Sequence, residues 1–263
     1  MKRYYIIAVL LLLATACKKE TGNTEAPAEA PKPEGLYFRT ETYSKKTSLP
    51  CKGGCTSVSI ELPVAENIPI VADSINKKIF NTVRGIVYFG EKPSDGKSYE
   101  EVMASFIGAY DKMKKDFPND PMLPWEARIN GETAYRSESI VNILIKSYMF
   151  TGGAHGYGAE RSLLFDATTG RSLTNEDIFT DIKGVTAFAE KKFREKFKVP
   201  AGKNINATGF MFEGDKFALP QNIFFTKEGL LLYYNPYEIA SYAEQQKELL
   251  LPYDEVGIYL KVK

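Results

Sequence analysis

The stretch that decides the fold is residues 123–166, LPWEARINGETAYRSESIVNILIKSYMFTGGAHGYGAERSLLFD. It contains three runs rich in β-branched and aromatic residues, which are typical of strands: Leu123–Tyr135, Ser137–Phe150 and Tyr157–Asp166. The links between these runs are short. Consecutive strands joined by short links usually pair as antiparallel neighbours, so the stretch predicts a three-stranded meander.

Helices are expected both before and after this meander in the sequence. Before it, Ile70–Val83 carries apolar residues at helical spacing. A capping box, S-x-x-E, opens a second helix at Ser98 that runs to about Phe117, where a proline follows. After the meander, Thr174 resembles another N-cap, and a helix is predicted over Lys183–Phe197.

Four further strands complete the prediction. Leu36–Lys46 and Thr56–Leu62 alternate apolar and polar residues. Ile223–Phe225 and Gly229–Tyr234 form a predicted hairpin, and Asn235, followed by a proline, is expected to cap a short helix. This mix predicts an α+β fold in which antiparallel sheets pack against a few helices, preceded by a signal peptide and a disordered tether.

Residues 1–16 are interpreted as a lipoprotein signal peptide. Lys2 and Arg3 precede the apolar run Ile6–Leu13, which is too short to span a bilayer as a permanent helix. Small residues then lead to Cys17 in a pattern that resembles a bacterial lipobox, where the cysteine is diacylated and becomes the new N-terminus. A soluble secreted protein with an incidental cysteine is the alternative. We expect Cys17 to anchor the chain in a membrane by its lipid.

Residues 17–35 comprise this cysteine and a tether rich in proline and glutamate. The segment contains no aromatic residue, so it cannot bury enough apolar area to offset its ordering entropy. The whole chain is nearly neutral, with 34 Lys and Arg against 33 Asp and Glu. That balance argues against nucleic acid as a partner, because nucleic-acid-binding domains are usually strongly basic.

Cys51 and Cys55 enclose the short segment CKGGC. Compartments outside the cytoplasm are oxidising, and the two glycines allow a tight ring, so a Cys51–Cys55 disulfide is predicted in the turn between the first two strands. A redox pair is the alternative, although such pairs usually occur as Cys-x-x-Cys at the start of a helix. A zinc site would need two more ligands, which the sequence does not identify.

The one histidine, His155, lies in the glycine-rich segment TGGAHGYG. A single histidine excludes His-Glu-x-x-His zinc centres and limits any catalytic triad to this base. The favoured interpretation is a glycine-rich bend in which His155 bonds the backbone. A ligand loop of Gly152, Gly153, His155 and Gly156 is the second interpretation, and a catalytic base the third. No catalytic residue, metal ligand or cofactor is therefore assigned.

Four tyrosines, Tyr233, Tyr234, Tyr237 and Tyr242, lie close together in the sequence. Tyrosine rings stack on sugar faces and occur at protein contacts, which makes this group a possible aromatic contact patch. Tyrosine is also a common core residue in strands, and core packing is the favoured interpretation.

Several of these segments resemble domains of the bacterial cell envelope. Residues 151–156, TGGAHG, the pattern over Phe165–Phe179, and residues 235–240, NPYEIA, are similar to a C-terminal domain of unknown function. That domain occurs in the lysozyme-binding ectodomain of the anti-sigma-V factor RsiV. Residues 36–145 resemble the N-terminal domain found beside the catalytic domain of the peptidoglycan deacetylase PdaC. The resemblance implies two α+β domains, 36–145 and 146–263, which can form one compact unit.

The resemblance also implies a function in binding. The sequence shows no cytoplasmic sigma-binding segment and no zinc-hydrolase domain, so we expect a non-enzymatic lipoprotein of the cell envelope that binds or senses a lysozyme-like protein or peptidoglycan. An uncharacterised hydrolase of envelope glycan, with His155 as its base, is the alternative. The start of the mature chain at Cys17 resembles lipoproteins of the Bacteroidota, which favours the outer membrane of a Gram-negative bacterium.

Overall fold

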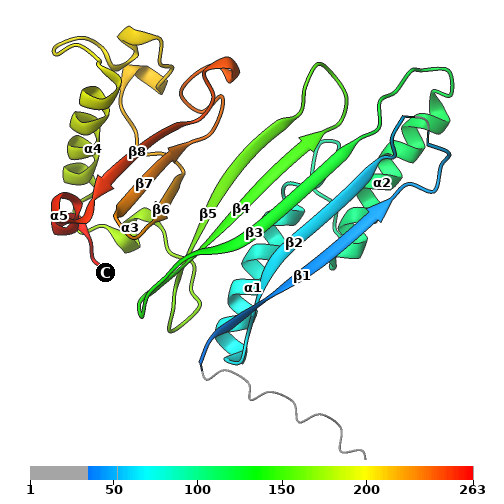
Figure 1. Cartoon of the computed structure of the whole chain (residues 1–263), viewed down its shortest axis with the longest axis horizontal. Coiled ribbons are helices and arrows are strands. Elements are labelled where there is room, and N and C mark those ends of the chain that lie inside the picture. Colours follow the sequence, from blue (N-terminus) through cyan, green and yellow to red (C-terminus); the bar gives the residue numbers. More distant parts are fainter. Residues whose placement is uncertain (1–34, 52, 263) are drawn as a thin grey trace, which may run out of the picture. The chain divides into compact units, whose positions relative to one another are not determined.

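A five-stranded sheet runs through the larger part of the fold (Figure 1). The computed structural model describes residues 35–51 and 53–262. The strands of this sheet lie in sequence order: β1 (Tyr37–Lys46), β2 (Ser57–Glu66), β3 (Glu126–Arg136), β4 (Ile140–Phe150) and β5 (Tyr157–Asp166). Strands β3, β4 and β5 form the antiparallel meander that residues 123–166 predict.

One strand pair departs from the expected antiparallel arrangement. Strands β2 and β3 run parallel, from the pair Ser57 and Glu126 to the pair Glu61 and Asn130. The chain between them forms the helices α1 (Pro69–Arg84) and α2 (Tyr99–Asp116). A parallel pair needs a long crossover of this kind, so the sheet is mixed rather than wholly antiparallel.

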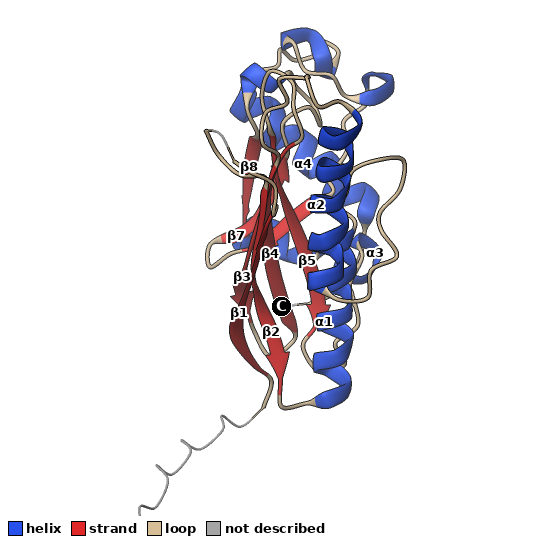
Figure 2. Ribbon diagram, turned by 90° about the vertical axis from the view of Figure 1, so that its right-hand side faces the viewer, coloured by secondary structure: helices blue, strands red, loops and turns tan. Residues whose placement is uncertain are grey.

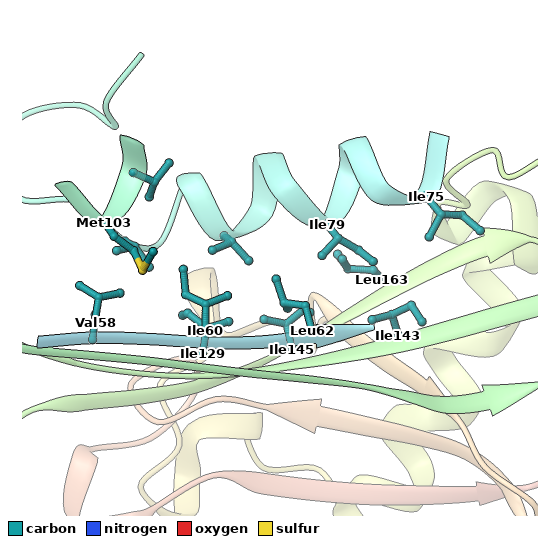
Figure 3. Close-up of a cluster of buried hydrophobic side chains, with 14 of the residues drawn as sticks. Val58, Ile60, Leu62, Ile75, Ile79, Met103, Ile129, Ile143, Ile145 and Leu163 are labelled. Carbon is teal, nitrogen blue, oxygen red and sulfur yellow. The ribbon is translucent and has the colours of Figure 1, made fainter. Parts of the chain in front are cut away.

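Helices α1 and α2 cover one face of this sheet (Figure 2). The apolar stripe of α1 includes Ile75 and Ile79, which point toward the sheet, where Leu62 of β2 and Ile143 of β4 lie (Figure 3). All four side chains are at most 1% exposed. Helix α2 begins at the predicted cap, since the Ser98 side chain accepts the backbone N–H of Glu101 at 3.3 Å.

A three-stranded antiparallel sheet forms the second layered part of the fold. It contains β6 (Asn222–Phe225), β7 (Gly229–Tyr234) and β8 (Lys247–Pro252). The hairpin of β6 and β7 confirms the sequence prediction, whereas β8 was not predicted. The helices of this part are α3 (Asn175–Ile178), α4 (Ile182–Phe197) and α5 (Tyr253–Val256), with 3-10 turns at Ile205–Thr208, Glu213–Asp215, Tyr242–Glu244 and Gly257–Tyr259.

The core of this second part gathers around one ring of α4. Phe193 is fully buried, and its ring centroid lies 4.9–5.9 Å from those of Phe210, Phe212, Phe217 and Tyr234. Edge-to-face aromatic pairs at such distances add about 0.5–1.5 kcal/mol each beyond the area they bury.

Two buried asparagines join the two sheets. The side chain of Asn142 on β4 is fully buried and accepts the backbone N–H of Phe225 at 2.9 Å. Its amide also donates to the hydroxyl of Ser162 at 2.9 Å. Asn222 of β6 accepts the backbone N–H of the same Ser162 at 3.0 Å. Because buried polar groups must be paired, these bonds fix where β6 lies against β4 and β5.

The described residues belong to a single compact unit. Residues 145 and 146, where the sequence places a domain boundary, lie inside β4, so the five-stranded sheet draws strands from both sides of it. Within 35–51 and 53–262, no helix combines the length and apolar character needed to cross a bilayer. The predicted signal peptide, Cys17 and all of the tether before Gly35 lie outside the described residues.

Candidate functional site

Four aromatic rings from two segments far apart in the sequence, residues 155–157 and 237–242, line up on the surface. Their order is Tyr157, Tyr237, Tyr242 and His155, and we call this group the aromatic ladder. Successive ring centroids lie 6.3, 5.4 and 4.3 Å apart, with interplanar angles of 29°, 29° and 11°. Rings at these separations and small angles are stacked with an offset, which leaves part of each face uncovered.

The ladder brings together residues from both groups proposed from the sequence, the ligand loop and the aromatic contact patch. His155 comes from the link between β4 and β5, and Tyr157 is the first residue of β5. Tyr237 lies in the loop after β7, and Tyr242 opens a 3-10 turn. The predicted ligand loop therefore meets part of the predicted tyrosine patch at one place.

The glycines of the ligand loop have two separate structural roles. Gly152 and Gly153 adopt positive φ angles of 106° and 87°, which L side chains rarely tolerate, so they turn the chain from β4 into β5. A Cβ on Gly156 would lie 2.5 Å from the outer end of the Tyr148 ring, so any larger residue there would require that ring to move. The favoured interpretation of a glycine-rich bend agrees with this geometry.

His155 is exposed, and its Nδ1 donates a hydrogen bond to the carbonyl of Gly156 at 2.9 Å. A carbonyl can only accept, so Nδ1 carries the proton, and Nε2 makes no hydrogen bond within residues 35–51 and 53–262. The hydroxyl of Tyr242 donates to the same carbonyl at 3.4 Å. The ring of His155 is thus held both by its backbone bond and by the stack on Tyr242.

The loop after β7 is fixed by its asparagine, which does not cap a helix as expected. The side-chain oxygen of Asn235 accepts the backbone N–H of Glu160 at 2.7 Å, and its amide donates to the carbonyl of Glu160 at 2.9 Å. The side chain therefore pairs with the edge of β5 as a neighbouring strand would. Residues 236–240 form a turn rather than a helix, because the amide serves β5 instead.

A glutamate supports this turn from inside. The carboxylate of Glu238 accepts the backbone N–H of Asn235 at 2.8 Å and that of Gln221 at 3.2 Å. Burial raises the pKa of Glu238, and the two hydrogen bonds oppose that rise. Its carboxylate is thus engaged by the protein's own backbone.

Tyr237 has a left-handed backbone, with φ at 69°, and a side chain that is 56% exposed. A bulky residue with positive φ costs about 1–2 kcal/mol relative to an ordinary conformation. Strain of this kind clusters at binding sites, where the surrounding structure holds it. Tyr157 beside it is 40% exposed, and its hydroxyl donates to the carbonyl of Pro236 at 3.2 Å.

The four predicted tyrosines divide into two core residues and two surface residues. Tyr233 is buried against Leu144 and Phe224, and Tyr234 is 1% exposed, with its hydroxyl donating to the carbonyl of Ala218 at 2.8 Å. Burial raises the pKa values of both phenols. Only Tyr237 and Tyr242 reach the ladder, together with Tyr157, which the sequence analysis did not select.

A shallow surface pocket of about 240 Å³ lies beside the ladder. Strand β5 contributes Tyr157, Ala159 and Arg161, which alternate along the strand and therefore share one face. Gln221, Asn222 and the loop 235–238 line the other side. Partial burial raises the pKa of the Tyr157 phenol, and the positive charge of Arg161 opposes the rise.

The arrangement offers stacking and hydrogen bonding to a ligand. The hydrogen bond of His155 among the described residues goes to a backbone carbonyl, not to a carboxylate that could orient it as a base. Within 35–51 and 53–262, no three side chains of His, Cys, Asp or Glu are grouped as metal ligands would be.

The disulfide lies in a different part of the chain. Cys51 and Cys55 are bonded, with their Cα atoms 5.1 Å apart, as the sequence predicts. The backbone N–H of Thr47 donates to the carbonyl of Thr56 at 2.9 Å, so the ring sits at the end of the β1–β2 hairpin.

Two known families match the chain in tandem. The family described as Deacetylase PdaC matches residues 50–157, and the protein family of unknown function DUF3298 matches residues 173–254. Their order is the one that the sequence resemblance predicts. The ladder draws on both matched regions, since His155 and Tyr157 lie in the first and Tyr237 and Tyr242 in the second.

Two solved structures share the fold. A DUF3298 family member from Bacteroides fragilis superposes with a TM-score of 0.66 at 22% identity, covering 86% of this chain and 93% of that one. A DUF3298 family protein from Pseudomonas aeruginosa gives a TM-score of 0.60 at 18% identity, covering 87% and 95%. A search of curated proteins finds no match. At these identities the similarity shows the fold alone.

Proposed function

We propose that this protein is a non-enzymatic binding module of the cell envelope and that its aromatic ladder binds the glycan of peptidoglycan. The observation that carries the proposal is the ladder itself, in which four partly open rings from distant segments meet beside a polar pocket.

Sugars present apolar faces rimmed by hydroxyl groups, and the site matches both features. The offset rings supply flat apolar surfaces, with Tyr237 more than half exposed. The pocket beside them adds the side chains of Gln221 and Arg161, which can donate hydrogen bonds to hydroxyl or carboxylate oxygens. Sites with aromatic walls and a few polar groups are typical of small-ligand binding.

The bent loop around His155 favours binding over hydrolysis. A catalytic base is expected in a pocket within hydrogen-bond reach of a nucleophile or carboxylate. His155 instead lies exposed in a bend and stacks on Tyr242 at 4.3 Å. A hydrolase of envelope glycan is therefore the weaker hypothesis.

We propose that Cys17 carries the lipid that holds this module at the outer membrane. Wild-type chain expressed in a Gram-negative host should take up labelled palmitate, and Cys17→Ala should not. Equal labelling of the two would exclude the lipid anchor.

Co-sedimentation with purified peptidoglycan sacculi tests the ligand. Wild-type protein should pellet with sacculi, and Tyr237→Ala should bind about 5–30-fold more weakly, because a central aromatic contact contributes about 1–2 kcal/mol. Thermal stability should change little, since most of this ring is exposed.

Tyr88→Ala is the matched control. Tyr88 is a half-buried tyrosine in the link after α1 and should leave binding unchanged. Because of the resemblance to a lysozyme-binding ectodomain, a parallel arm measures binding to lysozyme by calorimetry. Binding to lysozyme alone, with none to sacculi, would replace the glycan by a protein ligand. Equal pelleting of wild type and Tyr237→Ala would refute the role of the ladder.

A further inference from the structure

The pocket beside the aromatic ladder has a cation at its far end. Tyr157 and Arg161 are four residues apart on one face of β5, which places their Cα atoms roughly 13 Å apart. The pocket between them is about 240 Å³. This volume lies below the range of about 300–1,000 Å³ typical of drug-sized ligands, so the pocket suits one small polar unit of a longer chain.

Arg161 is the charge in this pocket that the protein leaves unused. Its side chain is exposed, and among the described residues its guanidinium has no ion pair or hydrogen bond. The other charged side chain lining the pocket is Glu238, which is occupied by two backbone N–H groups. Glu160, next along β5, points to the opposite face and pairs with Lys146 at 3.6 Å.

A guanidinium at the end of a stacking surface favours a ligand that carries a carboxylate. Its planar fork matches the two oxygens of a carboxylate, and such charge-assisted pairs are stronger than hydrogen bonds to a neutral hydroxyl. A neutral sugar would satisfy the rings but leave this charge without a partner.

We propose that Arg161 binds the carboxylate of an acidic sugar unit whose neighbouring sugar stacks on the aromatic ladder. The inference rests on the proposed function and narrows its ligand to a carboxylate-bearing glycan. In peptidoglycan that group is the lactyl carboxylate of a muramic acid whose peptide has been removed.

Two soluble probes separate the role of the rings from that of the charge. The neutral probe is the tetrasaccharide of N-acetylglucosamine. The acidic probe is the glucosamine–muramic acid tetrasaccharide of peptidoglycan with free lactyl carboxylates. Calorimetry on the full chain should show that the acidic probe binds about tenfold more tightly at low salt. The preference should shrink as salt rises, because Arg161 is exposed and its charge is screened.

Variants at Arg161 assign the preference. Arg161→Gln should bind both probes with the affinity of the neutral one, and Arg161→Lys should keep part of the preference, because it retains the charge but loses the fork. Arg136→Gln, at another exposed arginine, is the matched control and should keep the full preference.

The outcomes separate this inference from the proposed function. If neither probe binds wild type, the glycan proposal itself fails. If both bind equally to wild type, or if Arg161→Gln keeps the tenfold preference, the carboxylate assignment is overturned while glycan binding by the ladder stands.

Discussion

Replacing Asn235 by alanine should release the loop that carries Tyr237 from the edge of β5. The Asn235 side chain makes two hydrogen bonds to the backbone of Glu160, at 2.7 and 2.9 Å. Alanine removes both bonds. It keeps the backbone N–H that donates to Glu238, so the variant tests the side chain alone.

The magnitude follows from the number of bonds and their partial burial. A hydrogen bond makes a net contribution of about 1 kcal/mol to stability. A buried donor or acceptor that loses its partner and cannot reach water costs up to about 3 kcal/mol. Asn235 and Glu160 are half-buried, so water can replace part of the loss. We expect the free energy of unfolding to fall by about 2–3 kcal/mol. A domain of this size loses about 2–4 °C of Tm per kcal/mol, which gives a drop of about 4–12 °C.

Urea denaturation followed by circular dichroism measures the change. Asn130→Ala is the matched control: Asn130 is an exposed asparagine of β3, so the loss should stay below about 0.5 kcal/mol. Asn235→Asp adds a second check. It keeps an acceptor for the Glu160 N–H but sets a second oxygen against the Glu160 carbonyl, so it should be at least as destabilising as alanine. If Asn235→Ala matches Asn130→Ala, the pairing with β5 does not stabilise the fold.

Three further predictions concern other parts of the chain. Oxidised protein should show no reactive thiol at Cys51 or Cys55 in a titration, and two free thiols under non-reducing conditions would contradict the bridge. Replacing both cysteines by serine should lower the free energy of unfolding by only about 2 kcal/mol, because the closed loop is short. Burial raises the pKa of Glu238 above its ordinary value of 4.5. Its contribution to stability is therefore present below that value and is lost as pH rises through the folded pKa. Glu238→Gln should flatten this part of the pH profile of urea unfolding, and an unchanged slope would assign the pH dependence to other groups. Gly170→Ala should destabilise by about 2–4 kcal/mol, because φ is +70° and the new Cβ would lie 2.6 Å from a backbone carbonyl of α1. Gly202→Ala, with the same φ but open space around the new Cβ, should cost only about 1 kcal/mol in the same urea melts. Similar losses at the two sites would show that the close approach to α1 relaxes.

The strands and helices with strong local patterns were predictable from sequence. The meander over residues 123–166 and the cap of α2 at Ser98 both appear as expected. The parallel pairing of β2 with β3 was not, because alternation within a strand gives its faces but not its neighbour or direction. Strand β8, KELLLP, is as long as β7 but contains no β-branched or aromatic residue, so it lacks the composition that indicates a strand.

The candidate site was predictable only in part, and the tyrosines show why. Tyr233 and Tyr234 are consecutive in β7 and point to opposite faces. Both are buried because each face of β7 is covered, one by residues around Leu144 of β4 and the other by the core around Phe193. Covering of both faces depends on how two sheets pack, which no local pattern reports. Tyr157 was missed for the same reason: only the folded chain places it beside Tyr237.

The two most recognisable segments of the sequence each combine a structural residue with a ladder residue. In TGGAHG, Gly156 fits against Tyr148 and the neighbouring His155 joins the ladder. In NPYEIA, the side chain of Asn235 pairs with β5. Tyr237, two residues later, is the most exposed tyrosine of the aromatic ladder. A change in the structural residue should therefore weaken stability and binding together, whereas a change in the ring should weaken binding alone. That difference separates a surface built for a ligand from rings that only cover the joint between two sheets.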